Sequence, residues 1–313
     1  MSRLKFFEDE QPAFTNSADK ELKPIEEVKV NVGESLFLKY RGEQTVVTRI
    51  NGLVANHAET KREFHVNIDK SGGQFIVEVA LKDNIINFNP PQLEDAIALL
   101  CEVDNIKCQV KVLVDEHAGK IKKVLNQGEI IKRWTKYKND LNERYGFVRD
   151  ETTRKNLKSF IGLGEAQILD ERLLIADLQT KLFFDVFFDR YLVNNEMQLD
   201  AYRRTFLSQL FDGHPVELDM IPFIMHETPE TVTISETGKI NKGKLDLDGI
   251  EKIYDTKYKP IIQYKFSEFD FKYTAKTVFN TKDNLIETAQ VNIQEEVTNN
   301  VSVLISYSLK KLA

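Results

Sequence analysis

Few residues of this 313-residue chain stand at spacings that suggest catalytic chemistry. The closest two of its five histidines, His57 and His65, are eight positions apart, whereas zinc sites use shorter spacings such as HExxH or CxxC. The chain has neither a GxxxxGK[ST] phosphate loop nor a GxSxG nucleophile elbow. We therefore predict no metal site, no cofactor and no catalytic residue, and a scattered active site stays an alternative.

Two carboxylates are the exception. Asp185 and Asp189 stand four positions apart in a segment that we predict to be one helix over residues 182–192. At this spacing two like charges share a face and repel each other, but together they can bind a cation or hold a proton. The alternative is a polar stripe with Arg190 as counter-charge.

The same segment is rich in aromatic residues. On a helix, Phe183, Phe187 and Tyr191 would form one column, and Phe184, Phe188 and Leu192 the next. This broad face is either the core beneath a sheet or the lining of an apolar cavity or groove. We predict a site for an apolar ligand or a protein segment, formed by Phe183, Phe184, Phe187, Phe188 and Tyr191.

Period-2 alternation predicts the elements that position this segment. Leu36, Leu38 and Tyr40 alternate with other residues near the beginning, and strict alternation returns from Phe269 to Leu309. Alternation is typical of antiparallel sheets with one buried face. We predict an α+β fold in which antiparallel meandering sheets wrap around a helical middle segment.

Changes in hydrophobic periodicity divide the chain into four predicted segments. Residues 1–25 are a flexible tail, and 26–146 contain a sheet and capped helices. Residues 147–213 are helical and include a stripe of Leu199, Tyr202, Phe206 and Leu210, while 214–313 form a sheet that packs with 26–146 as one unit. Gly119-Lys120-Ile121 and Gly238-Lys239-Ile240 each precede a helix that begins like a capped one, at Asn126 and Asp248, which suggests a weak internal repeat of hairpin and helix.

Val110–Trp134 and Phe269–Leu309 together carry a resemblance to a known family. Their strand, glycine hairpin, capped helix and closing meander resemble the curved half-barrels of bacterial lipoprotein carriers and related envelope proteins. The resemblance implies a strongly bent antiparallel sheet that encloses helices and an apolar cavity. It carries over no functional residue, and the chain has neither an export signal nor a lipobox cysteine.

Composition limits the partners. The net charge is −6 and no Lys/Arg block exceeds a pair, so we predict no nucleic acid as partner. No run approaches the roughly 18–20 apolar residues of a membrane span, the first residues do not form a secretory signal, and Cys101 and Cys108 are expected to be buried thiols, all of which favours a cytoplasmic location. The predicted function is a non-catalytic binding protein. The alternative is an interaction protein, such as an immunity protein, an adaptor, or a component of a secretion or phage-tail-like assembly.

Overall fold

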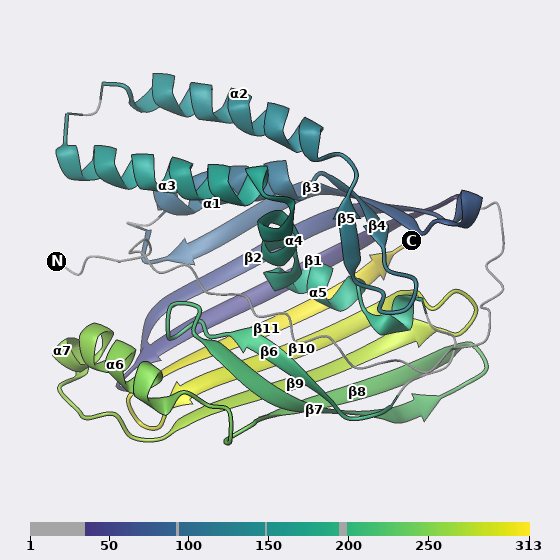
Figure 1. Ribbon diagram of the computed structural model, residues 1–313. Coiled ribbons are helices and arrows are strands. Elements are labelled where there is room, and N and C mark those ends of the chain that lie inside the picture. Colours follow the sequence, from purple (N-terminus) through teal and green to yellow (C-terminus); the bar gives the residue numbers. More distant parts are fainter. Residues whose placement is uncertain (1–34, 92–93, 148, 194–198) are drawn as a thin grey trace.

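The alternating segments form one antiparallel sheet in the computed structural model, which describes residues 35–91, 94–147, 149–193 and 199–313 (Figure 1). The predicted tail, residues 1–25, lies outside this range. The described residues contain eleven strands, which are β1 (Ser35–Ile50), β2 (Leu53–Asp69), β3 (Ile76–Asn89), β4 (Val110–Val114), β5 (Ile121–Val124), β6 (Tyr202–Leu207), β7 (Pro215–Glu227), β8 (Thr231–Ile240), β9 (Phe269–Asn280), β10 (Ile286–Val297) and β11 (Val301–Leu312). The helices are α1 (Glu94–Lys107), α2 (Gln127–Tyr145), α3 (Glu151–Leu169), α4 (Glu171–Thr180), α5 (Leu182–Phe187), α6 (Leu247–Lys257) and α7 (Lys259–Ile262), with 3₁₀ turns at η1 (Ser71–Gly73) and η3 (Arg190–Leu192).

The strand order is that of two meanders joined at the middle of the sheet. Neighbouring strands run β5-β4-β3-β2-β1-β11-β10-β9-β8-β7-β6, so β1 and β11 pair with each other, from Lys39 opposite Leu312 to Ile50 opposite Val301. The chain crosses from the β5 edge to the β6 edge through α2, α3, α4 and α5. The prediction of an antiparallel α+β fold with sheet from both ends of the chain is therefore confirmed.

Alternation decides which face of the sheet is buried. In β9, Phe269, Phe271 and Tyr273 are buried while Lys272 and Thr274 between and beyond them are exposed. Successive side chains of a strand point to opposite faces, so the three rings lie on one face of the sheet. The α5 helix packs against this same face. One core therefore runs across both meanders.

The α5–η3 segment, Leu182–Leu192, lies on this buried face and contacts strands of both meanders. Phe183 stacks on Phe64 of β2 with ring centroids 3.8 Å apart, and Tyr191 lies 5.3 Å from Phe279 of β9. The prediction that the sheet encloses the helical middle agrees with this arrangement.

Helices α1, α2, α3 and α4 lie beside the N-terminal meander, whereas α6 and α7 lie at one end of the C-terminal meander (Figure 1). Trp134 of α2 packs against Gly164 of α3, where an added Cβ would stand 2.7 Å from the indole ring. Lys107 at the end of α1 forms an ion pair with Asp177 of α4 at 2.7 Å, and Lys181 lies 2.9 Å from Asp104 of α1. These contacts place α4, and with it α5, against the sheet.

Two helix predictions are wrong. The segment 182–192 is not one helix, because α5 ends at Phe187, Phe188 leaves the helical conformation (φ −89°, ψ 78°), and Asp189 is extended before η3. The stripe at Leu199, Tyr202, Phe206 and Leu210 is not helical either, since Tyr202–Leu207 form β6. A spacing of four fits both a helix and the even positions of a strand, so the pattern alone did not separate them.

The predicted repeat is also wrong in its second half. Gly119 does lie in the turn between β4 and β5, with φ +67°, but Gly238 lies inside β8, opposite Tyr273 of β9. An added Cβ at Gly238 would stand 2.7 Å from the Met220 sulfur, so this glycine makes room for packing rather than for a turn. In the helix that follows, the residue that caps the first turn is Asp246 rather than Asp248.

The first predicted cap is replaced by another contact. Asn126 makes no side-chain cap bond to α2, and its side chain instead accepts from the Lys111 N–H at 2.8 Å. Cys101 and Cys108 are both free thiols, of which Cys108 is buried and Cys101 half-buried. Among the described helices, none is long and apolar enough to cross a membrane.

We expect Phe187→Ala to lower the free energy of unfolding by about 3–5 kcal/mol, as truncation of a buried phenylalanine does. The side chain is 1 % exposed, and its ring lies 5.6 Å from Tyr40 and 5.5 Å from Phe183. Denaturant unfolding measures the change. Phe147→Ala, at a side chain that is 78 % exposed, is the control and should stay within about 0.5 kcal/mol. A loss near 1 kcal/mol at Phe187 would instead indicate open space beside the ring.

Candidate ligand-binding pocket

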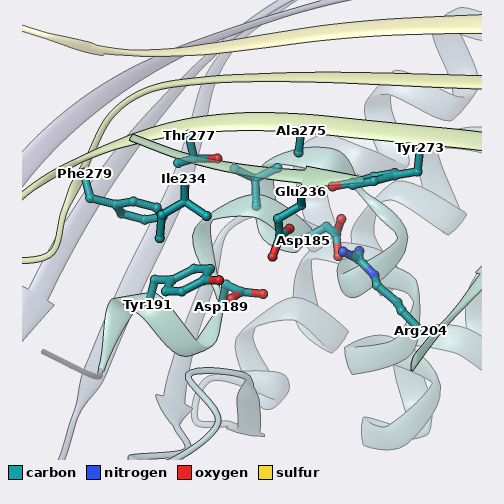
Figure 2. Close-up of a pocket in the computed structure, with 11 residues that line it drawn as sticks. Asp185, Asp189, Tyr191, Arg204, Ile234, Glu236, Tyr273, Ala275, Thr277 and Phe279 are labelled. Carbon is teal, nitrogen blue, oxygen red and sulfur yellow. The ribbon is translucent and has the colours of Figure 1, made fainter. Parts of the chain in front are cut away.

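A narrow pocket lies between the α5–η3 segment and the C-terminal meander (Figure 2). Its walls come from α5–η3, β6, β8 and β9, and the lining residues are Asp185, Val186, Asp189, Tyr191, Arg204, Ile234, Glu236, Tyr273, Ala275, Thr277 and Phe279. The space that a water molecule could occupy is about 30 Å³. A cavity needs at least about 10–15 Å³ of such space to hold one water molecule, so the pocket admits only a small group.

The pocket has a polar end and an apolar end. Figure 2 shows Asp185, Arg204 and Tyr273 toward one side and Phe279, Ile234 and Tyr191 toward the other. Glu236 and Asp189 lie between them, and in this view their carboxylates point toward one another. A group bound here would therefore meet carboxylate oxygens on one side and ring and methyl surfaces on the other.

Asp185 and Arg204 form a closed ion pair at the polar end. An Arg204 Nη donates to Asp185 Oδ1, and the guanidinium lies 4.4 Å from the centroid of the Phe206 ring. Burial alone would lower the pKa of Arg204, but the Asp185 carboxylate outweighs it and raises that pKa. This pair keeps both charges in the pocket wall.

Asp189 has one paired and one unpaired oxygen. Lys120 Nζ donates to Oδ2 at 3.1 Å, whereas Oδ1 is buried and has no hydrogen-bond partner among the described residues. Burial would raise the pKa of Asp189, but the charge of Lys120, helped by Arg204 and Arg190, lowers it overall. Asp189 is therefore ionised at neutral pH and presents a free acceptor.

Gly119 is the residue that lets Lys120 reach Asp189. An added Cβ at Gly119 would stand 1.9 Å from the Asp189 carbonyl oxygen, and the backbone there has φ +67°. Both facts favour glycine, because it has no Cβ and tolerates positive φ. The β4–β5 turn thus approaches η3 closely enough for the ion pair.

Glu236 behaves in the opposite way. Burial and then the Asp189 charge raise the pKa of Glu236, which Arg190 and Arg204 only partly offset. Its Oε1 accepts from the Tyr202 hydroxyl at 3.2 Å, and Arg190 Nη2 lies 3.6 Å from the same oxygen. Glu236 therefore holds its proton to a higher pH than an ordinary glutamate, beside an Asp189 that stays ionised.

The structure separates the predicted site residues into two groups. Phe183, Phe184, Phe187 and Phe188 are buried in the core and do not line this pocket, whereas Tyr191 does. These four rings hold α5 against the sheet, and a ligand-binding role for them stays a prediction. The carboxylate pair singled out from the sequence does line the pocket, but Asp185 and Asp189 bind different cationic side chains instead of one shared ion.

Sequence reasoning missed Arg204, Glu236 and Tyr273 as site residues. Arg204 lies on the strand that was predicted as a helix, and Glu236 lies in the segment that was predicted as a hairpin. Tyr273 was predicted on the alternating strand but only as part of the sheet. The one signal for Arg204 was a charged residue between two aromatics at period 2, Tyr202 and Phe206.

Metal binding finds no support in the described part of the chain, where no three side chains of His, Cys, Asp or Glu gather in a metal-binding arrangement. Comparison with protein-family models and with curated proteins gives no match for this chain. The interpretation of the pocket therefore depends on its own geometry and electrostatics.

The two carboxylates should respond in opposite ways to neutralisation. The raised pKa of Glu236 means that its contribution to stability is present below its unfolded pKa of about 4.3 and is lost as the pH rises through the folded value. The lowered pKa of Asp189 means that its contribution is present above about 3.9 and is lost as the pH falls through the folded value.

At pH 8 we therefore expect Glu236→Gln to be at least as stable as the parent, an advantage that shrinks toward pH 4. Asp189→Asn should lose about 1.5–3 kcal/mol at pH 8, the value of a hydrogen bond to a charged group. Denaturant unfolding at several pH values measures both. Equal destabilisation by the two variants at pH 8 would contradict the opposite pKa directions.

Proposed function

We propose that the protein is a non-catalytic binding protein that holds a small ligand, or the end of a larger one, in the pocket between α5–η3 and the C-terminal meander. The observation that carries this proposal is the unpaired Asp189 Oδ1, buried between the polar and the apolar end of the pocket (Figure 2). A buried acceptor without a partner costs about 1–3 kcal/mol, which a donor on a ligand would recover.

The apolar wall supports the predicted preference for an apolar ligand in a modified form. Phe279, Ile234 and Tyr191 offer contact to a hydrocarbon chain, but the carboxylates beside them require a polar end as well. The aromatic residues of α5 contribute by fixing Asp185 and Asp189 opposite β6 and β8. A cytoplasmic location belongs to the same proposal.

The resemblance to bacterial lipoprotein carriers is compatible with this location of the pocket. In that family the cavity lies between a bent sheet and the helices that it encloses, and the pocket here likewise lies between the sheet and α5–η3. A relationship with those carriers stays a proposal.

Methyl NMR of the full chain tests the pocket without assuming the ligand. We expect at least one of n-butanol, butyrate and n-butylamine to shift the Ile234 and Val186 methyl signals saturably. Ala275→Leu fills the pocket and should abolish the shifts, whereas Thr274→Val, at the exposed neighbouring position of β9, should preserve them. If none of the three compounds shifts these signals, the proposed function is wrong.

An interaction protein is the second candidate, and the edge of β7 favours it. β6 pairs with β7 only as far as Tyr202 opposite Met220, and within the described residues Ile221–Glu227 pair with β8 alone. Ile221, Phe223, Ile224 and Met225 are 49, 44, 38 and 58 % exposed. An open apolar edge of this kind recruits an extended strand from another chain.

Such an edge should also recruit copies of the protein itself. We expect sedimentation velocity to show association that grows with concentration, and Phe223→Lys to weaken it, because a charge on an edge strand opposes pairing. Ile261→Lys is the control, since Ile261 is 56 % exposed on α7, away from any strand edge. The parent protein could stay monomeric at all concentrations, or both variants could change self-association equally. Either result would count against strand pairing at the open β7 edge.

A further inference from the structure

The cationic side chains around the pocket already have partners, whereas one buried acceptor in its wall does not. Lys120 binds Asp189 Oδ2, Arg204 binds Asp185, and Arg190 donates to the Tyr191 hydroxyl at 3.0 Å. Asp189 Oδ1 has no partner among the described residues. A group that donates a hydrogen bond would satisfy this acceptor, whereas a carboxylate or phosphate would meet the charge of the ionised Asp189 unfavourably.

The volume of the pocket restricts which hydrogen-bond donor group can enter it. About 30 Å³ of space accommodates a water-sized group, which an ammonium head is and a trimethylammonium or guanidinium head is not. An ammonium group carries three N–H donors and a full charge, and hydrogen bonds between charged partners are about twice as strong as neutral ones.

Resting on the proposed function, we propose that the pocket binds a primary alkylamine. Its ammonium group enters the space beside Asp189 and Glu236, and only the carbon next to the nitrogen meets the side formed by Phe279, Ile234 and Tyr191. The proposed function does not specify the chemical class of the ligand, and this proposal names it as an amine. Figure 2 shows the two carboxylates on one side of the apolar residues, as this placement requires.

Binding of the cation should release a proton. Charged groups face Glu236 from every wall of the pocket. They are Lys120 of the β4–β5 turn, Asp185, Asp189 and Arg190 of α5–η3, and Arg204 of β6. The hydroxyls of Tyr191, Tyr202 and Tyr273 also lie around it. An added positive charge opposes the effect of Asp189, which raises the pKa of Glu236, so a bound ammonium lowers that pKa and favours loss of the Glu236 proton. Affinity should consequently rise with pH as Glu236 loses its proton.

The test titrates n-butylammonium, n-butanol and butyltrimethylammonium into the full chain, followed by methyl NMR and calorimetry. We expect n-butylammonium to bind about tenfold or more tightly than n-butanol, which corresponds to one charged hydrogen bond, and the trimethyl compound not to bind. Calorimetry in buffers of different ionisation enthalpy should show proton release for the amine only. Asp189→Asn should lose this preference, and Asp219→Asn, at an exposed residue of β7, should keep it.

The outcomes separate the two proposals. If n-butanol binds as tightly as the amine, the pocket is a ligand site but the amine class is wrong. If no compound binds, the proposed function fails and the pocket holds water only. Should Asp189→Asn not fold, Glu236→Gln decides, because its amine affinity must rise less with pH than that of the parent; an unchanged pH dependence overturns the role of Glu236.

Discussion

The packing of one eleven-residue segment, Leu182–Leu192, is the constraint on which the rest of the structure depends. Its rings contact β2 through Phe64, β1 through Tyr40 and β9 through Phe279, so it fills the buried face of both meanders at once. The same segment carries Asp185 and Asp189, and burying it therefore buries two charges. Their partners must come from whichever strands or turns lie within reach, which are β6 and the β4–β5 turn.

This requirement links the sheet edges to the core. Arg204 of β6 and Lys120 of the β4–β5 turn reach the segment from opposite ends of the strand order. Breaking a buried pair by removing one partner typically costs about 3–5 kcal/mol, although the intact pair stabilises little beyond an apolar replacement. The ion pairs thus restrict where each edge can lie more than they add to stability. The pocket lies between the packed aromatic rings of this segment and the ion pairs of Asp185 and Asp189.

The sequence predicted the sheet better than the pocket, for a physical reason. Burial on one face imposes period 2 on every strand, and this local pattern identified the strands at both ends of the chain. Which residues meet across the sheet depends on register, however, and no local pattern places Arg204 of β6 beside Asp185 or Glu236 of β8 beside Asp189. The aromatic spacing from Phe183 to Tyr191 fitted a helix, yet the backbone leaves the helix at Phe188, where tertiary contacts outweigh periodicity. Asp185 and Asp189 could be singled out because both lie in that one short segment.

The pairing of β1 with β11 has a consequence for how the protein is made. Ile50 and Val301 are partners although about 250 residues separate them. At a synthesis rate of about 5–20 residues per second, β1 exists for roughly 10–50 s before its neighbour leaves the ribosome. During that time β2 can pair with one side of β1 while the other side has no native partner. The strand β1, which lies at the centre of the finished sheet, is therefore an edge strand of the nascent sheet. An unpaired edge strand promotes aggregation, so the nascent chain is exposed to aggregation at a strand that is fully paired in the mature protein.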